Sequence, residues 1–525
     1  MSLKKIVLLF AACLLITVFT QPAYAKSFSD KKPAEIQLTA PGDLQRLIRT
    51  GIIIDTVSKP TVNVYISPDE FSILEKAGFS IRWVPNYAKF AHDNYFNNNV
   101  LRKEKADGLN YPTYAELTSI LTTIASDYPE ICKLESAGKS VQGNDLWWVK
   151  ITDNVNTEEP EPEVHYISTL HGDEPVGTVL CLELIKHLTS NYDSNNDVKN
   201  LVDATEIWIM PLMNPDGYDA GERFNADGDD LNRSFPDPST AGVDACNSTE
   251  GKPVEVAAIM NWSLNHTPVL GASFHTGALV VNYPFDYTQM LCPDDTLFEY
   301  ISLKYSEQND PMYNLPYPSY ATDGIVRGSL WYEVAGGLQD WTYLATGANH
   351  ITIELNREKW PEISKLAGLW DDNQASMMAY LETAHFGVKG IVTDQNTGEP
   401  VSAWIRVEEI DHVVYTDPDV GDFHRMLLPG DYNLIVRADG YSPFSQQITI
   451  SDGSALTLAI KLEPGDDTSE DTGKNWPTGT DNGNNSSGGD SSPSVPDSTQ
   501  PDEDDVTADG NNGGGCFITL IDANF

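Results

Sequence analysis

The sequence predicts an α/β sheet with helices on both faces, followed by a small all-β sandwich and preceded by a small α+β block. Between about residues 110 and 386, apolar runs typical of buried strands alternate with helical stretches. From 387 to 463 the helices stop, and short alternating strands are separated by turns such as Asn396-Thr397-Gly398. The 525 residues are too many for one core, so several folded units are expected.

Each element is assigned from its apolar pattern and its flanking turn residues. The expected strands of the sheet are Leu146–Lys150, Glu163–Thr169, Glu206–Met210, Val269–Phe274 and His350–Leu355. The expected helices are Val179–Leu188, Val254–Asn265 and Asp371–Ala384. In the sandwich, the expected strands are Gly387–Thr393, Ala403–Glu408, Asp431–Ala438 and Gln446–Ile450.

Residues 33–95 form the predicted N-terminal block. Val62–Ile66 alternates like a strand, Ser67-Pro68 is typical of a helix start, and Phe79–Val84 is a second strand. A unit of this size is either a pro-segment or an accessory domain. The polar stretch Asn97–Asn110 follows it and contains Arg102, Lys103 and Lys105, so it is either a linker open to proteolysis or an ordinary loop.

The first 25 residues have the pattern of a signal peptide. Lys4 and Lys5 precede an apolar run from Ile6 to Phe19, and Ala23-Tyr24-Ala25 predicts cleavage after Ala25. No later segment is long and apolar enough to cross a bilayer, so no transmembrane segment is expected. We therefore expect export, to an extracellular, cell-surface or periplasmic location.

The formal charge of −44, with 77 acidic and 33 basic residues, argues against nucleic acid or an anionic membrane as a partner. The stretch 464–515 has almost no apolar residues and is predicted to be a disordered acidic linker. The cysteines show no CxxC spacing, which argues against a cysteine zinc site and leaves disulfide pairing open.

The first candidate ligands are His171 and Glu174. They follow a predicted strand in His171-Gly172-Asp173-Glu174-Pro175, and a helix comes next. Imidazole and carboxylate both suit zinc, and two groups spaced i and i+3 at a strand end can meet one cation. The alternative is a surface histidine beside a glutamate that starts a helix.

A third candidate ligand, His275, ends another apolar strand in Ser273-Phe274-His275-Thr276-Gly277. Two histidines and one carboxylate leave a fourth tetrahedral position open, as in catalytic zinc sites. Glu354 lies within the apolar run Ile351–Leu355, where a free carboxylate is costly, so a paired or functional role is expected.

Between these ligands, Asn214-Pro215-Asp216-Gly217 and Asp230-Leu231-Asn232-Arg233 occupy a loop-rich region that also contains Arg223. The planar fork of an arginine matches a carboxylate, whereas the alternative is a surface salt-bridge network. Two further motifs follow in order, Asn282-Tyr283-Pro284-Phe285-Asp286 and Gly336-Gly337-Leu338-Gln339-Asp340-Trp341.

In this combination and order, the motifs resemble those of the zinc carboxypeptidase family, specifically the branch of carboxypeptidases N, E, M and D, over about residues 110–463. The resemblance implies a mixed, doubly wound carboxypeptidase-like catalytic domain (110–386) and a transthyretin-like sandwich (387–463). It also implies a zinc-dependent peptidase that hydrolyses the C-terminal peptide bond of peptides and proteins. One Zn²⁺ per chain is expected.

The family implies a role for each matching residue. His171, Glu174 and His275 bind zinc; Glu354 is the general base that activates the zinc-bound water; and Arg223 stabilises the oxyanion. Asn232, Arg233 and Tyr332 hold the terminal carboxylate of the substrate. Asp230 matches the carboxylate that orients His171.

The resemblance also implies a preference for C-terminal Lys or Arg. In this branch the positions of Asp286 and Gln339 lie in the pocket for the last side chain, where a carboxylate pairs with a basic group. The alternative for Asp286 is that it only caps a loop. Leu338 replaces the methionine usual in this motif, and Asn349-His350 also departs from the family pattern, so catalysis is expected to be intact but the pocket less defined.

Two other functions stay open. One is an amidohydrolase acting on acylated amino acids or cell-wall peptides, although such relatives usually lack the Asn232, Arg233 and Tyr332 pattern. The other is a non-catalytic binding module, against which the intact Glu354 argues. We expect a monomer that acts on peptide C-termini. Residues 516–525 resemble a bacterial sorting tag, so attachment to the cell surface through Cys516 is a further hypothesis.

Overall fold

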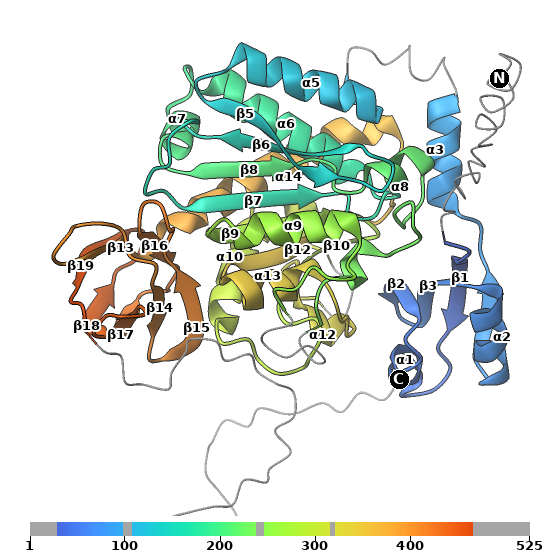
Figure 1. The fold of residues 1–525 in the computed structure, drawn as a ribbon. Helices are drawn as coiled ribbons and strands as arrows, with labels where there is room; N and C mark the ends of the chain where they lie inside the picture. Colours follow the sequence, from blue (N-terminus) through green and yellow to red (C-terminus); the bar gives the residue numbers. More distant parts are fainter. Residues whose placement is uncertain (1–28, 98–107, 238–245, 316–320, 466–525) are drawn as a thin grey trace, which may run out of the picture. The chain divides into compact units, whose positions relative to one another are not determined.

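The computed structural model describes residues 29–97, 108–237, 246–315 and 321–465. The predicted signal peptide, the basic residues Arg102, Lys103 and Lys105, nearly all of the acidic linker, and Cys516 with the sorting tag lie outside the described residues. The described part contains the block, the large sheet and the sandwich that the sequence predicts (Figure 1).

The central element is a mixed sheet of eight strands whose inner strands β12, β9, β7 and β8 run parallel to one another. Strand β10 pairs antiparallel with β12, and β6 pairs antiparallel with both β8 and β5. In spatial order the strands are β11 (Ile325–Arg327), β10 (Ala278–Tyr283), β12 (Asn349–Asn356), β9 (Pro268–His275), β7 (Glu163–Ser168), β8 (Glu206–Met210), β6 (Asp145–Ile151) and β5 (Cys132–Lys139). The predicted α/β class is confirmed.

Two hydrophobic cores lie on the two faces of this sheet. On one face, α6 (Val176–Asn191), α10 (Asp295–Ser306) and α14 (Leu366–Glu382) pack together over the strands, with α5 (Tyr114–Asp127) in the same core. On the other face, α9 (Val254–Leu264) and α13 (Leu338–Thr346) cover a core rich in tryptophan. In Figure 1, α9 and α13 stand in front of the strands and α6 and α14 behind them. Each predicted helix matches one of these elements.

Short helices connect the larger elements, many of them at the ends of strands where loops are free to carry function. Among the described residues they are α7 (Asn196–Val202), α8 (Pro215–Ala220), α11 (Asp310–Tyr313), α12 (Gly328–Trp331), and the 3₁₀ turns η1 (Leu231–Arg233), η3 (Ile363–Lys365) and η4 (Thr383–His385). None of the helices in the described part is both long enough and apolar enough to cross a membrane.

The N-terminal block is larger than the predicted strand–helix–strand unit. It is an antiparallel sheet in the order β2 (Ile53–Ser58), β3 (Thr61–Ile66), β1 (Lys32–Gln37) and β4 (Ser80–Trp83), with helices α1 (Asp43–Ile48), α2 (Pro68–Lys76) and α3 (Tyr87–Asn97). The predicted strands are β3 and β4, and the predicted helix is α2, which Ser67 caps. Strands β1 and β2 and helices α1 and α3 were not predicted. The alternation of β1, which separates β3 from β4, is short and interrupted by charge.

Strand β2 lies at the edge of the block and contains a bulge. Its register with β3 shifts between Ile54 and Thr56, so that Asp55 is the additional residue. A bulge re-aims a side chain away from the regular alternation of a strand. The apolar core of the block also continues into the catalytic domain, through Val280 on β10 and Trp331 on α12.

The sandwich consists of a three-stranded and a four-stranded sheet that enclose a separate apolar core. Their strands are β16 (Asp422–Arg425), β13 (Gly387–Asp394) and β19 (Ala455–Leu462), and β15 (Ile410–Tyr415), β14 (Trp404–Val407), β17 (Gly430–Arg437) and β18 (Phe444–Ile450). Arg425 forms a buried 2.8 Å ion pair with Asp294 at the start of α10, and His412 stacks on Tyr343 of α13. These contacts fix the sandwich to the catalytic domain.

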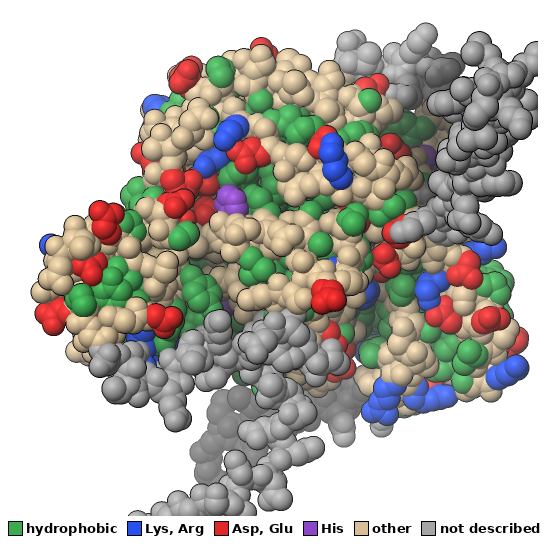
Figure 2. All heavy atoms as spheres, viewed as in Figure 1, with side chains coloured by type: hydrophobic (Ala, Val, Ile, Leu, Met, Phe, Trp, Pro, Cys, Tyr) green, Lys and Arg blue, Asp and Glu red, His purple; other side chains and the backbone are tan. Residues whose placement is uncertain are grey.

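The described residues show the state of the cysteines and the distribution of charge on one face. The cysteines in the described part (Cys132, Cys181, Cys246 and Cys292) are buried and free, so no disulfide joins them. Figure 2 shows basic side chains in small separate groups, with acidic groups scattered among them, on the face that it presents.

Candidate active site

The three candidate metal ligands meet at the carboxyl ends of two parallel strands. His171 and Glu174 lie in the loop between β7 and α6, which begins with Thr169 at a positive φ of 54°. His275 is the last residue of β9, the neighbour of β7 in the sheet. In an open α/β sheet, this is the edge at which ligands bind.

The distances between the ligand atoms fit a zinc ion. The Nδ1 atoms of His171 and His275 are 3.2 Å apart, and Glu174 places one carboxylate oxygen 3.1 Å from the first and the other 2.9 Å from the second. Two nitrogen ligands on a tetrahedral zinc stand about 3.3 Å apart. All three side chains are buried. One donor atom from each of them lies within 4.8 Å of the donor atoms of the other two. The donor set is therefore one that zinc would fit.

A carboxylate behind the site orients the first ligand. Asp230 lies 3.1 Å from Nε2 of His171 and also accepts a 2.9 Å hydrogen bond from Nε of Arg223. Although burial opposes it, the charges of Arg223 and His171 hold the pKa of Asp230 well below its usual range. Asp230 thus fixes the histidine ring and the guanidinium relative to each other.

A group of polar side chains surrounds the ligands on one side. Asn232 and Arg233 lie in η1, and the Asn232 amide is 3.5 Å from Nε2 of His275 while its oxygen accepts the Leu338 N–H. Tyr332 follows α12 and lines the same pocket. Two arginines, an amide and a phenol thus face one small space, which suits a carboxylate.

Glu354 lies on β12 opposite His275, its backbone partner on β9. Burial and the charge of Glu174 raise its pKa to about 8. Among the described residues, its Oε2 has no hydrogen-bond partner. A buried carboxylate with a raised pKa beside a metal site suits proton transfer.

Asp286 follows β10, is buried, and lines the same pocket as the three ligands. Burial raises its pKa to about 6, although Asn282, Arg233 and Gln339 oppose this. Within the described part, its Oδ1 and the Oδ1 of Asn282 have no hydrogen-bond partner. An added methyl group at Gly328 would lie 1.6 Å from Asp286 Oδ1, so the carboxylate rests against the start of α12.

A residue that was not predicted from the sequence occupies the site. Asp55, in the bulge of β2, accepts a 2.9 Å hydrogen bond from Arg223 and a 2.6 Å hydrogen bond from Lys359. The neighbouring carbonyl of Ile54 accepts from Arg233, and that of Asp55 accepts from Tyr332. With the block in place, the active-site pocket retains only about 30 Å³.

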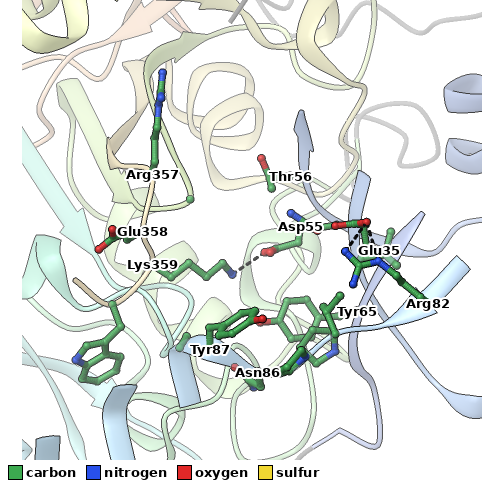
Figure 3. A pocket seen from close by; sticks show the side chains of 18 residues that line it. Glu35, Asp55, Thr56, Tyr65, Arg82, Asn86, Tyr87, Arg357, Glu358 and Lys359 are labelled. Carbon is green, nitrogen blue, oxygen red and sulfur yellow. Dashed lines mark hydrogen bonds and ion pairs between the residues drawn. The ribbon is translucent and has the colours of Figure 1, made fainter. Parts of the chain in front are cut away.

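Lys359 was missed as well. It lies five residues after Glu354 and contacts Asp55, Asp173 and Glu174. Figure 3 shows Lys359 extending toward Asp55 across a cavity of 670 Å³ between the block and the catalytic domain.

The sequence contains one indication of a role for Asp55. It is a charged residue within the apolar run Ile52–Val57, where an unpaired carboxylate is costly.

Comparisons with known proteins agree with this geometry. A family model described as zinc carboxypeptidase matches residues 117–376, and a carboxypeptidase regulatory-like domain matches 387–463. Carboxypeptidase M of Mus musculus is 34% identical over 376 residues, which cover 66% of this chain and 82% of that protein. The chain belongs to the zinc carboxypeptidase family. This confirms the resemblance on which the site residues were assigned.

One further relative is much longer than this chain, and one solved structure is similar to it in fold alone. Carboxypeptidase D of Homo sapiens is 35% identical over 432 residues, which are 78% of this chain but only 30% of that protein. The crystal structure of carboxypeptidase A from Helicoverpa armigera is 17% identical, with a TM-score of 0.55 over 68% of this chain and 99% of that one. This second likeness shows the fold.

Proposed function

We propose that this chain is a zinc-dependent carboxypeptidase that removes single residues from the C-terminus of peptides and proteins, with a preference for Lys and Arg. The observation that carries the proposal is the convergence of donor atoms of His171, Glu174 and His275 to about 3 Å of one another, in a pocket that two arginines also line. Membership of the family supports the same activity. One zinc ion per chain is held by these three residues.

The clamp explains why the enzyme trims chain ends. Arg233, Asn232 and Tyr332 bind the terminal carboxylate, because a guanidinium, an amide and a phenol together supply several donors to two oxygens. A mid-chain peptide lacks that charge and leaves the guanidinium unpaired in a partly buried site. Because the clamp lines the same pocket as the metal ligands, a carboxylate held there would bring the last peptide bond close to those ligands.

The chemistry is divided among the remaining residues. The zinc ion, when bound, polarises the scissile carbonyl and favours hydroxide near neutral pH. Glu354 takes a proton from the attacking water and passes it to the leaving amine. Arg223, held by Asp230, donates to the oxygen on which negative charge develops.

The preference for basic residues is assigned to Asp286, with Gln339 beside it. A buried carboxylate oxygen that lacks a partner among the described residues is costly, and the ammonium of Lys or guanidinium of Arg would supply the missing donors. The alternative, a loop cap, would require Asp286 to accept backbone N–H groups with that oxygen.

We further propose that the N-terminal block is an inhibitory pro-segment. Asp55 and the carbonyl groups of Ile54 and Asp55 occupy the donors that the substrate needs, namely Arg223, Arg233 and Tyr332. Activity then requires the block to leave, after cleavage in the stretch Asn97–Asn110. Export of the chain, action as a monomer and attachment through Cys516 remain predictions of the sequence.

The decisive experiment uses hippuryl peptides that end in Arg, Lys, Phe or Asp. The full chain is assayed before and after limited trypsin cleavage, with and without a zinc chelator. We expect release of Arg and Lys after cleavage, and none with the chelator or in the variant Glu354→Gln. Equal release of Phe and Arg would reject the basic preference, release of acyl groups alone would favour an amidohydrolase, and no hydrolysis of any peptide would favour a binding module.

A further inference from the structure

A second buried carboxylate lies directly behind the pocket residue Asp286. Asp340 is the third residue of α13, is 2% exposed, and belongs to the same helical turn as Gln339. Its carboxylate does not cap its own helix. Instead it faces the loop after β10, which is 54 positions earlier in the chain.

The hydrogen bonds of Asp340 go to the backbone of that loop. Its two oxygens accept the N–H of Asp286 at 2.9 and 3.1 Å, and one of them also accepts the N–H of Tyr287 at 2.9 Å. Two successive amide groups are thereby held by one side chain. The orientation of the Asp286 side chain depends on this backbone, because the Cα–Cβ direction is fixed by the peptide planes on both sides.

Other contacts hold the carbonyl groups of the same two peptide units. The N–H groups of Ser329 and Val334 donate to the carbonyls of Phe285 and Asp286, each at 3.0 Å. These bonds tie the loop to α12 and would persist without Asp340. Asp340 supplies the hydrogen bonds to the N–H groups of these peptide units, and Gly328 leaves the room in which the carboxylate of Asp286 lies.

The arrangement is electrostatically costly. Burial and the neighbouring charge of Asp286 raise the pKa of Asp340 well above its usual range. Two carboxylates buried side by side repel each other, and a cation entering the pocket reduces that repulsion. The positive end of α13 offsets part of the cost for Asp340.

We propose that Asp340 is a positioning residue for substrate selection, which holds the backbone of Asp286 so that its carboxylate faces a C-terminal Lys or Arg. The inference rests on the proposed carboxypeptidase function and names a residue that acts through Asp286. Asp340 itself is not among the described residues that line the active-site pocket. Its effect is therefore confined to substrates that use the Asp286 charge.

The test compares Asp340→Asn and Asp340→Ala in the trypsin-activated full chain. The asparagine variant keeps one acceptor oxygen for the loop, whereas the alanine variant keeps none. With hippuryl-Arg, we expect kcat/KM to fall about fivefold in the first and at least thirtyfold in the second, mainly through KM. With hippuryl-Phe, both variants should stay within about twofold of the wild type.

Asp394 supplies a matched control in the sandwich. It also accepts two backbone N–H groups, from Asn396 and Thr397, at 2.7 and 2.8 Å. Asp394→Asn should leave the Arg-to-Phe ratio unchanged, even if it lowers the melting temperature. If alanine at position 340 prevents folding, the asparagine variant alone decides the question.

The outcomes separate the two proposals. A wild type that prefers Arg, with variants that keep its ratio or lose both substrates equally, would leave the proposed function intact and overturn the role of Asp340. A wild type without any preference for Arg would overturn both. A stepwise loss of the ratio from wild type through asparagine to alanine supports the positioning role.

Discussion

The carboxylate of Asp55 lies 2.9 Å from the guanidinium of Arg223, although the two residues are 168 positions apart in the chain. The contact exists because β2 is an edge strand with a bulge at this residue. Arg223 is also held by Asp230, so a residue of the block and a residue of the catalytic domain share one guanidinium. Five predictions follow from this relationship and from the site around it.

Replacing Asp55 by alanine in the uncleaved chain should raise peptidase activity. Hydrogen bonds to charged groups contribute roughly 1.5–3 kcal/mol of stability. Losing those to Arg223 and Lys359 should therefore raise the population of chains whose block has left the active site about tenfold to a hundredfold. Release of Arg from hippuryl-Arg measures the change. The exposed Asp69 of the same block is the control, and an uncleaved Asp55→Ala chain as inactive as the wild type would contradict the inhibitory role.

Replacing Glu354 by glutamine should lower kcat by about two to four orders of magnitude, because the amide cannot accept the proton of the attacking water. Zinc content, measured by atomic emission, should stay near one per chain since the three ligands are untouched. Loss of zinc together with activity would show that Glu354 supports the metal rather than the proton transfer.

Replacing His275 by alanine should remove the metal and the activity together. A metal that binds the folded state but not the unfolded state stabilises the folded state. The melting temperature of the wild type should therefore depend on zinc, and a chelator should lower it. His187 does not line the active-site pocket, and His187→Ala should keep both zinc and the thermal shift. A variant at position 275 that binds zinc as tightly as the wild type would refute the ligand assignment.

The preference for Arg over Phe should decline as the pH falls through about 6. The pKa of Asp286 is raised to about 6, so the carboxylate is charged above this pH and neutral below it. At pH 5 only about a tenth of it remains ionised. The ratio of kcat/KM for the two hippuryl substrates isolates this effect, because protonation of Glu354 acts equally on both. A ratio that stays constant between pH 5 and 7.5 would exclude Asp286 as the source of the preference.

Replacing Gly328 by alanine should lower kcat/KM for hippuryl-Arg at least tenfold, and for hippuryl-Phe much less. The added methyl group would lie 1.6 Å from Asp286 Oδ1 and 2.5 Å from Asn282 Oδ1, so the carboxylate must move. Gly368 on α14 has open space at the same position and provides the control. An unchanged preference in Gly328→Ala would show that the carboxylate does not contact the substrate.

The sequence was sufficient to predict the parallel inner strands of the sheet with β6, the strands β13, β14, β17 and β18 of the sandwich, and the three candidate ligands, because these depend on local patterns. Strands β5, β10 and β11 of the sheet were not predicted. Buried parallel strands are continuous apolar runs, and His171 and His275 each follow such a run directly. The carboxyl ends of neighbouring parallel strands meet at one edge, so residues 104 positions apart could be brought together by topology alone.

The residues whose contacts were not predicted from the sequence depend on distant pairing. Asp55 enters the site because β3 displaces it from the regular alternation of β2, and no local pattern shows a bulge. Asp340 gains its partners from a loop that precedes it by 54 positions. Lys359 follows a turn after β12 and finds Asp55 only once the block has folded against it.

Helix α13 joins two parts of the molecule that the sequence treats as separate. Its first turn carries Gln339 and Asp340, and further along the same helix Tyr343 stacks on His412 of the sandwich and donates a hydrogen bond to Asp294, the partner of Arg425. A chain cut after residue 386 would expose Tyr343 and Asp294 to water and leave this helix without its outer support. The sandwich thus supports the helix that carries the two residues of the proposed selectivity, and we expect shortened versions of the chain to lose selectivity before they lose peptidase activity.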